Sequence, residues 1–335
     1  MMRLQWLTVA VLICHASTVR ADSRLWFGSL NYESARLVVP VLLVVSTDEE
    51  GNEWSLGVTG WTLSGERKTA IDSTRKRQWF ARVTPINAQS GHYVYRDGQR
   101  DAAAEFSASS VELGGGLEVA HRSRWTGAYR VLAVYGPVKD LDPELVAYWK
   151  RPFAGVEIAQ TYVRVTSDEL LGSRWEGVKV GGTAQFLTGT RTWSRMQARI
   201  GAGKRIGPLM LSARGAAFTG RSLNTVNAFV IGGSWDLAPP DLIVGYRYAE
   251  FRLDRAATVG GAFDLRVRGA WEVGLRGSYL KGQAIEEYGA AVQMMTVWKG
   301  AVFNAGVAVP KASFARGTTD RIVVFATLSA AILKP

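Results

Sequence analysis

The feature that most constrains this chain is a two-residue alternation of apolar and polar or small side chains, repeated many times. In the segment 111–119, Val111, Leu113 and Leu117 share one parity, whereas Glu112 and Glu118 share the other. A period of two is that of a β-strand, whose successive side chains point to opposite faces. The sequence therefore predicts an all-β chain. A helical pattern is expected only over residues 141–150.

Turn-forming residues such as Gly207-Pro208 and Pro239-Pro240-Asp241 separate the alternating segments. We count eighteen such segments, to within about two because boundaries read in this way are soft, and therefore expect about 16–18 strands. The expected strands lie near residues 24–32, 36–47, 53–64, 77–85, 91–97, 105–120, 125–136, 153–165, 174–187, 192–204, 208–219, 224–236, 242–253, 259–268, 271–281, 288–298, 301–309 and 320–333.

Two architectures use this many strands: a soluble β-sandwich or propeller, and a transmembrane β-barrel with a polar lumen. Three features favour the barrel. The polar parity is rich in Gly, Ser, Thr, Gln and Arg, and most segments reach the roughly 9–11 residues that a tilted membrane strand needs. Aromatic residues also gather at segment ends, as in an interfacial girdle. The tryptophans concerned are Trp26, Trp54, Trp79, Trp125, Trp175, Trp193, Trp271 and Trp298.

The first residues have the pattern of a secretory signal peptide. Arg3 supplies the positive start, residues 7–13 are apolar, and Val19 and Ala21 stand where a signal peptidase reads small residues. A lipoprotein signal at Cys14 is the alternative, although Ile13 is bulky for it. We therefore expect a signal peptide over 1–21 and one barrel domain over 22–335. Its removal takes away the only cysteine and lowers the net charge from +11 to +9, since Arg3 and Arg20 are lost.

The segment from Arg321 to Leu333 resembles the closing strand of a Gram-negative outer-membrane β-barrel, the porin-like class, and no specific family is recognised. Its lipid-facing parity would be Ile322, Val324, Ala326, Leu328, Ala330 and Ile332. The resemblance implies a transmembrane antiparallel up-and-down barrel in the outer membrane. It also implies contact with outer-membrane lipid and lipopolysaccharide, and with the outer-membrane assembly machinery. The chain departs from the class by ending in Lys334-Pro335 instead of an aromatic residue.

Charged residues of the polar parity should face the lumen, because a cation facing lipid at the membrane midplane costs about 2–4 kcal/mol. The expected lumen cations are Arg82, Arg130, Lys179, Arg195, Arg199, Arg214, Arg247, Arg266, Arg268 and Arg276. The expected lumen anions are Glu112, Glu118, Glu157, Asp264 and Glu272. An excess of arginine in a narrow channel attracts anions. The sequence thus predicts a channel for anionic solutes or an acidic polysaccharide. The alternative is a ladder of ion pairs that stiffens the wall.

Two connections stand out. Residues 65–77 form a basic loop with Arg67, Lys68, Arg75, Lys76 and Arg77, which strand counting places outside the cell. It would bind lipopolysaccharide phosphates or be a solvated loop. Residues 137–152 are the longest expected connection, either a plug or a surface loop.

Other function classes find little support. After signal removal only His92 and His121 remain as histidine bases, and no spacing suggests a catalytic site, a metal site or a bound cofactor. The arginines are scattered, which argues against nucleic acid as the partner. We expect a channel and no enzyme. The alternatives are a plugged barrel with an assembly, envelope-structural or surface-adhesion role, and a barrel hydrolase; export-pathway proteins are conceivable partners of a polysaccharide channel.

Overall fold

The structure is a computed structural model. It describes residues 22–33, 36–38, 41–47, 52–59, 62–71, 77–92, 95–96, 99–100, 106–122, 124–136, 138–139, 143–169, 174–224, 226–232, 243–246, 250–283, 285–298, 301–311 and 322–332. The expected signal peptide over 1–21 lies outside these residues. Among the residues described, no helix has the length and apolar character needed to cross a membrane.

A single sheet of eighteen strands dominates the described residues. Two of them, β2 (Arg36–Val38) and β11 (Val138–Lys139), are short extensions. The other sixteen are β1 (Asp22–Glu33), β3 (Val41–Thr47), β4 (Glu53–Thr59), β5 (Thr62–Ala70), β6 (Arg77–His92), β9 (Phe106–Arg122), β10 (Trp125–Tyr135), β12 (Phe153–Glu169), β13 (Arg174–Thr188), β14 (Trp193–Ile206), β15 (Leu209–Arg221), β18 (Arg255–Arg268), β19 (Trp271–Gly282), β20 (Glu286–Trp298), β21 (Ala301–Pro310) and β22 (Val323–Ile332).

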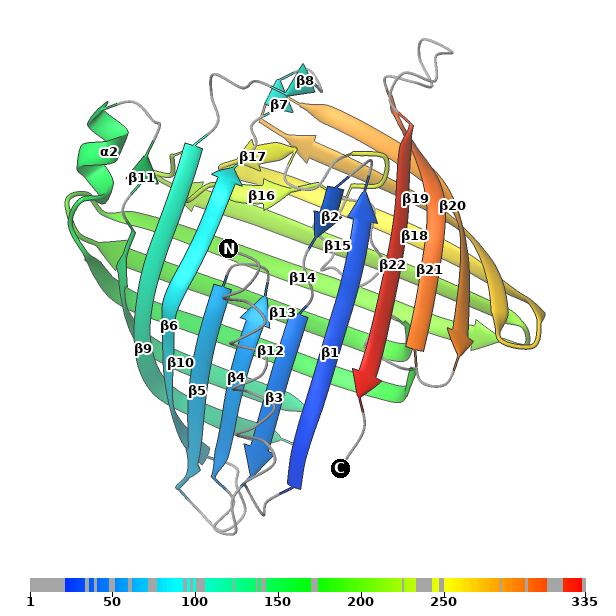
Figure 1. The fold of residues 1–335 in the computed structure, drawn as a ribbon, viewed down its shortest axis with the longest axis horizontal. Helices are drawn as coiled ribbons and strands as arrows, with labels where there is room; N and C mark the ends of the chain where they lie inside the picture. Colours follow the sequence, from blue (N-terminus) through cyan, green and yellow to red (C-terminus); the bar gives the residue numbers. More distant parts are fainter. Residues whose placement is uncertain are drawn as a thin grey trace.

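The sixteen strands form a closed ring (Figure 1). Each long strand pairs antiparallel with the next in the chain, and β1 pairs with β22 from Leu25 opposite Ile332 to Glu33 opposite Phe325. This closure satisfies the backbone groups of both terminal strands, which an open sheet would leave exposed. The expected number of 16–18 strands is confirmed, and the architecture is an antiparallel up-and-down barrel.

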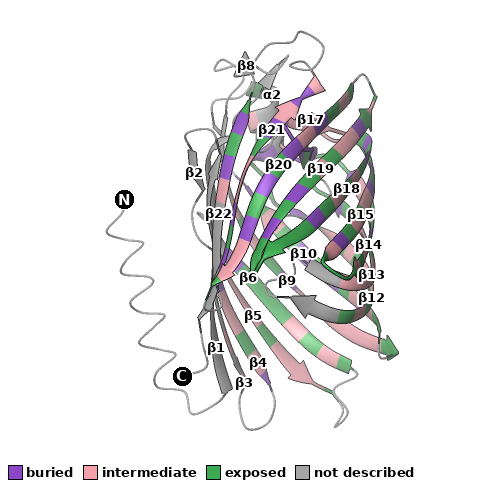
Figure 2. Cartoon of the chain, turned by 90° about the vertical axis from the view of Figure 1, so that its right-hand side faces the viewer, coloured by how far each residue is buried: buried purple, intermediate pink, exposed green. Residues whose placement is uncertain are grey.

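The wall alternates between exposed and buried residues, as the sequence pattern predicts (Figure 2). On β19, Val273 and Leu275 are 42% and 56% exposed on the outer side. Glu272, which precedes Val273 and has the opposite parity, is 5% exposed. On β22, Val324 is exposed, whereas its neighbours Val323 and Phe325 are buried. The barrel therefore has an apolar outer surface and an interior that holds most of its charged wall residues.

The two ends of the barrel differ in their connections. One end carries the short turns at 123–124, 207–208 and 269–270, together with the first residue of β1 and the last residue of β22. The other end carries the long connections between β10 and β12 and between β15 and β18, with α2, β7 and β8 (Figure 1). We call these the short-turn end and the long-loop end. Outer-membrane barrels have short periplasmic turns and longer extracellular loops.

The basic loop expected over 65–77 requires correction. Arg67 and Lys68 lie within β5, and Arg77 is the first residue of β6. Arg75 and Lys76 lie outside the described residues. The sequence pattern merged β4 and β5 into one strand over 53–64, and each missed strand reverses the side of every later connection. The link from β5 to β6 therefore lies at the short-turn end, the end opposite to the one expected.

In the connection between Arg221 and Arg255, the described residues 222–224, 226–232, 243–246 and 250–254 fold into the ring instead of adding to it, and we call this connection the inner segment. Its strands β16 (Phe229–Ile231) and β17 (Phe251–Leu253) pair only with each other. Phe229, Ile231 and Ile243 pack on inward side chains of β15, β18 and β19. The wall strands expected at 224–236 and 242–253 are therefore wrong, because this apolar alternation faces the lumen wall and not lipid. The inner segment, and not 137–152, is the longest connection.

The connection 137–152 forms β11 and the short helix α2 (Pro143–Trp149) at the long-loop end. Trp149 is 6% exposed and packs with Phe153 and the inward residues Leu132, Leu187 and Trp193. Trp193 therefore belongs to the interior, which corrects its expected place in the aromatic girdle. The expected strand at 91–97 is also absent: residues 91–92 end β6, and β7 (Tyr95–Arg96) pairs with β8 (Gln99–Arg100).

Candidate functional site

The lumen carries a ladder of polar side chains that lie directly opposite one another on neighbouring strands. Arg130 on β10 faces Glu157 on β12, which faces Gln185 on β13, which faces Arg195 on β14. Arg130 donates from Nη1 to Glu112 Oε1 at 2.7 Å and contacts Glu157 Oε1 from Nη2 at 3.0 Å. Gln185 donates to Glu157 and accepts from Arg195 Nε. We call this row the Arg130 ladder.

Glycine makes room for the centre of the Arg130 ladder. Arg130 is 7% exposed, and a Cβ on Gly114 would lie 3.1 Å from its Cδ. Gly114 on β9 thus leaves space for the methylene groups of the Arg130 side chain. Two carboxylates compensate this buried cation, as the desolvation of an arginine requires.

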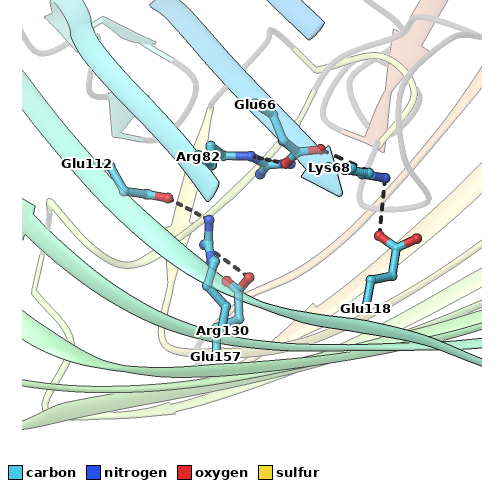
Figure 3. Close-up of polar contacts among 7 residues, drawn as sticks. All are labelled: Glu66, Lys68, Arg82, Glu112, Glu118, Arg130 and Glu157. Atoms are coloured by element: carbon cyan, nitrogen blue, oxygen red, sulfur yellow. Dashed lines mark hydrogen bonds and ion pairs between the residues drawn. The ribbon is translucent and has the colours of Figure 1, made fainter. Parts of the chain in front are cut away.

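A second group of ion pairs lies on the neighbouring strands β5, β6 and β9 (Figure 3). Arg82 Nη2 contacts Glu66 Oε2 at 2.6 Å, and Lys68 Nζ contacts Glu118 Oε2 at 3.2 Å. Lys68 also lies 3.8 Å from Glu66 Oε1. Arg82 is 44% exposed at its side chain, so this group meets more solvent than the Arg130 ladder does.

The opposite part of the lumen has its own polar network on β18–β21. Arg276 Nη2 lies 3.7 Å from Asp264 Oδ2, and Gln293 donates to Asp264 Oδ1 at 3.4 Å. Asn304 continues the network to Gln293 at 3.4 Å. Nearer the short turns, Glu272 is contacted by Arg266 at 3.4 Å and Arg205 at 3.7 Å. The ion pairs described so far thus give carboxylate partners to four of the ten predicted lumen cations, Arg82, Arg130, Arg266 and Arg276.

Three more predicted cations form what we call the cationic strip: Lys179 on β13, Arg199 on β14 and Arg214 on β15. Lys179 and Arg214 lie directly opposite Gly201, and Arg199 is two residues along the same strand. These three strands, as described, contain one carboxylate, Glu176, and it lines a groove on the outer surface. The inward side of β13–β15 therefore carries cations without an acidic residue on the same strands.

A cavity of about 350 Å³ lies between the Arg130 ladder and the inner segment. Glu157, Gln185 and Arg195 line it from the wall, and Phe229 and Val230 of β16 close it. The guanidinium of Arg195 thus borders space that the inner segment encloses.

The inner segment is fixed to the wall at its turn, residues 243–246. The Tyr246 hydroxyl donates to Glu287 on β20, and Val244 N donates to Ser278 Oγ on β19 at 2.7 Å. The fit is close: a Cβ on Gly289 would lie 1.8 Å from Val244 O. Gly245 has φ +87° and lies against Val309 and Pro310, so both its conformation and its space call for glycine. Burial raises the pKa of Tyr246 above its ordinary value, and the hydrogen bond to Glu287 raises it further.

The remaining predicted cations are less central. Arg268 is exposed and lies next to the turn at 269–270, and Arg247 lies outside the described residues. Carboxylates that sequence reasoning passed over, Glu66 and Glu287, are central to the contacts observed. The alternation of β5 marks Glu66 once that strand is recognised, but no local pattern links Glu287 to Tyr246.

The expected girdle tryptophans lie near the short-turn end. Trp54, Trp79, Trp125, Trp271 and Trp298 are 41–69% exposed and lie within three residues of a strand end there. Trp26 and Trp175 lie in β1 and β13 at the same end, and their side chains lie outside the description. Trp125 donates from Nε1 to Gln160 Oε1 at 2.7 Å, and Arg67 lies 4.6 Å from the centre of the Trp54 ring. Such polar contacts suit tryptophan side chains that lie at the level of the lipid headgroups.

The two histidines form no catalytic arrangement among the described residues. His121 Nε2 lies 3.4 Å from the Tyr129 hydroxyl near the short-turn end, and His92 is the last residue of β6. Across the described ranges, no group of three or more His, Cys, Asp or Glu side chains is arranged to hold a metal ion.

Solved structures share this fold at very low sequence identity. BamA from Haemophilus ducreyi, lacking POTRA domains 1–3, superposes with a TM-score of 0.68 at 7% identity, over 93% of this chain and 70% of that one. CdiB from Acinetobacter baumannii gives 0.57 at 10% identity, over 93% of this chain and 60% of that one. CdiB from Escherichia coli gives 0.57 at 8% identity, covering 92% and 63%.

No known protein family matches the sequence. No curated protein matches it either. The chain spans less than two thirds of the CdiB chains. At these identities the likeness concerns the fold, which is that of an outer-membrane β-barrel of the transmembrane, up-and-down type.

Proposed function

We propose that this protein is an outer-membrane channel that is closed at rest by its inner segment and prefers anionic solutes when that segment moves aside. The observation that carries the proposal is the cationic strip on β13–β15, where three cations gather on strands that carry no inward carboxylate among the described residues. In a narrow lumen with low-dielectric walls, such a strip raises the local concentration of anions.

Closure at rest follows from the packing of the inner segment. Ile231 and Ile243 are at most 1% exposed, and each buried side chain of this kind contributes about 1.5–3 kcal/mol. The turn at 243–246 adds the hydrogen bonds of Tyr246 and Val244 to β20 and β19. The segment thus has a defined docked state, and it can leave only when these contacts are broken together.

The test is conductance of the purified full chain in planar bilayers. In Gly289→Val the new Cβ would lie 1.8 Å from Val244 O, so we expect this variant to displace the inner turn and raise conductance. Gly277→Val is the matched control, because a Cβ there meets no atom within 4 Å. In the open variant a salt gradient should give an anion-selective reversal potential. Cation selectivity of the open variant would sink the proposal.

A second candidate is a plugged barrel with an assembly, envelope-structural or surface-adhesion role. The buried docking of the inner segment favours it, together with the fold shared with BamA and CdiB. No rise in conductance for a folded Gly289→Val variant would support this candidate instead of the channel.

The proposal extends to targeting and partners. Residues 1–21 would act as a signal peptide, leaving the barrel domain over 22–335. The short-turn end would face the periplasm, and the chain would meet outer-membrane lipid, lipopolysaccharide and the outer-membrane assembly machinery. An acidic polysaccharide, delivered by export-pathway proteins, is the larger solute class that the strip would accept. N-terminal sequencing of the protein from outer-membrane fractions tests the targeting.

A further inference from the structure

The outer wall of the barrel is interrupted by a furrow of about 870 Å³ across β12–β19. Ala202, Ala213, Gly261 and Gly277 lie directly opposite one another on four adjacent strands and form its floor. Leu211, Phe263 and Leu275 are 38–56% exposed and border it on one side. A row of small side chains beside a row of large ones leaves a hollow on an otherwise apolar surface.

The glycines of the furrow are not required by the chain's own packing. A Cβ on Gly277 would meet no atom within 4 Å, and one on Gly261 would meet only Ser212 O, at 3.5 Å. Neither residue is among the glycines with positive φ. Glycine weakens a strand interior and often marks a place where a ligand approaches closely. Here the protein leaves a space that larger residues would fill without strain.

Two cations lie at one end of the furrow. Arg164 on β12 faces Val178, which faces Ala202 on the floor, and Lys204 lies two residues beyond Ala202. Both are exposed, and the described residues offer neither of them an ion pair. Glu176 is the one carboxylate in the lining, so the charge at this end is positive. Lys204 is two residues from the end of β14, near the level of the girdle tryptophans.

We propose that this furrow binds an anionic phospholipid, with one acyl chain along Ala202–Gly277 and the phosphate at Arg164 and Lys204. The furrow crosses six strands, or about 24 Å at the usual strand spacing. One leaflet of hydrocarbon is only about 15 Å thick. Because barrel strands tilt by roughly 35–45°, a furrow that crosses them also slants through the bilayer. A furrow of this length has room for one acyl chain along Ala202–Gly277 together with its headgroup at Arg164 and Lys204.

The chemistry at the charged end favours a phosphate over a neutral headgroup. Arginine and lysine both donate strongly to phosphate oxygens, and each cation near an anionic lipid surface contributes about 1 kcal/mol, or about fivefold in affinity. The net positive end should therefore discriminate phosphatidylglycerol from zwitterionic phosphatidylcholine. This inference rests on the barrel fold and does not depend on the channel function.

The experiment is native mass spectrometry of the detergent-purified full chain, titrated with phosphatidylglycerol or phosphatidylcholine. The wild type should bind phosphatidylglycerol more tightly. The double variant G261L/G277L fills the furrow with side chains like its neighbours, so it should lose affinity for both lipids by about tenfold. R164Q/K204Q should lose about fivefold or more for phosphatidylglycerol alone.

The matched control is R122Q/R124Q, which removes two exposed cations at the same end of the barrel but outside the furrow. It should bind both lipids as the wild type does. Folding of each variant is checked by the different migration of heated and unheated protein in detergent gels. Equal binding of both lipids by the wild type overturns the proposal, and so does wild-type affinity in folded G261L/G277L. If G261L/G277L does not fold, an unchanged preference in R164Q/K204Q overturns it.

Discussion

The two sides of the lumen handle charge in different ways. On β9–β12, Arg130 is buried between Glu112 and Glu157, and both of these ion pairs join it to the wall. On β13–β15, Lys179, Arg199 and Arg214 share their strands with no inward carboxylate among the described residues. The first arrangement uses charge to hold strands together, and the second gathers three cations on adjacent strands. The compensated side matches the ladder of ion pairs that the sequence left open as one interpretation of its arginines, and the cation-rich side is the one on which the proposed anion preference rests.

The largest effect is expected on the compensated side. Arg130→Ala leaves two carboxylates facing each other in the space beside Gly114, and breaking a buried ion pair in this way costs about 3–5 kcal/mol. Urea unfolding of the refolded barrel in lipid vesicles measures the loss. The triple variant R130M/E112Q/E157Q removes the charges together and should recover much of it. A loss below about 1 kcal/mol for R130A would show that the ladder is not structural.

In the proposed channel, docking of the inner segment would decide whether a solute reaches the two sides of the lumen. Tyr246→Phe removes the donor to Glu287, and a hydrogen bond to a charged group contributes about 1.5–3 kcal/mol. The ratio of docked to undocked states should therefore fall by at least about tenfold, which single-channel recording measures as a rise in open probability. Phe251→Leu, which keeps an apolar neighbour of the same ring, is the control. An unchanged open probability in Tyr246→Phe would show that this hydrogen bond does not hold the channel closed.

The same contact predicts a pH dependence. Burial and Glu287 raise the pKa of Tyr246, so the docked state keeps the hydroxyl proton where a free tyrosine would lose it. The contribution to docking is therefore complete below pH 10, the ordinary tyrosine pKa, and declines as the pH rises above it. Open probability should stay flat from neutral pH to about pH 10 and then rise in the wild type, with no rise in Tyr246→Phe.

The sequence predicted the wall well and the interior poorly, for one physical reason. Alternation shows only that one face of a strand avoids water. Val273 and Leu275 do so on the outer, lipid-facing surface of the barrel, whereas Phe229 and Ile231 do so by packing on the lumen wall. The pattern therefore cannot separate a wall strand from β16. Tyr246 and Glu287 are 41 residues apart, and only the closed ring brings them together.

The cation-rich side should control selectivity with little effect on stability. In the Gly289→Val background, R199E/R214E reverses two charges of the cationic strip. We expect the anion-to-cation permeability ratio to fall by about tenfold, equivalent to about 1.4 kcal/mol. Reversal potentials in a salt gradient measure the ratio. R151E/R191E changes two exposed cations at the long-loop end and serves as the control. An equal shift in the control would assign selectivity to the surface charge instead of the strip.

The smallest effect is expected for the exposed ion pair of Arg82, in contrast with the buried ion pairs of Arg130. Arg82 and Glu66 lie opposite each other on β6 and β5 with a contact of 2.6 Å, shorter than either Arg130 contact, yet the Arg82 side chain is 44% exposed. Water screens such a pair and solvates the carboxylate that remains, so Arg82→Ala should cost only about 0.2–1 kcal/mol in the urea experiment. A loss as large as that of Arg130→Ala would mean that distance, and not burial, sets the strength of these pairs. A small loss assigns the structural role to the buried arginine, because burial is what makes an unpaired carboxylate costly.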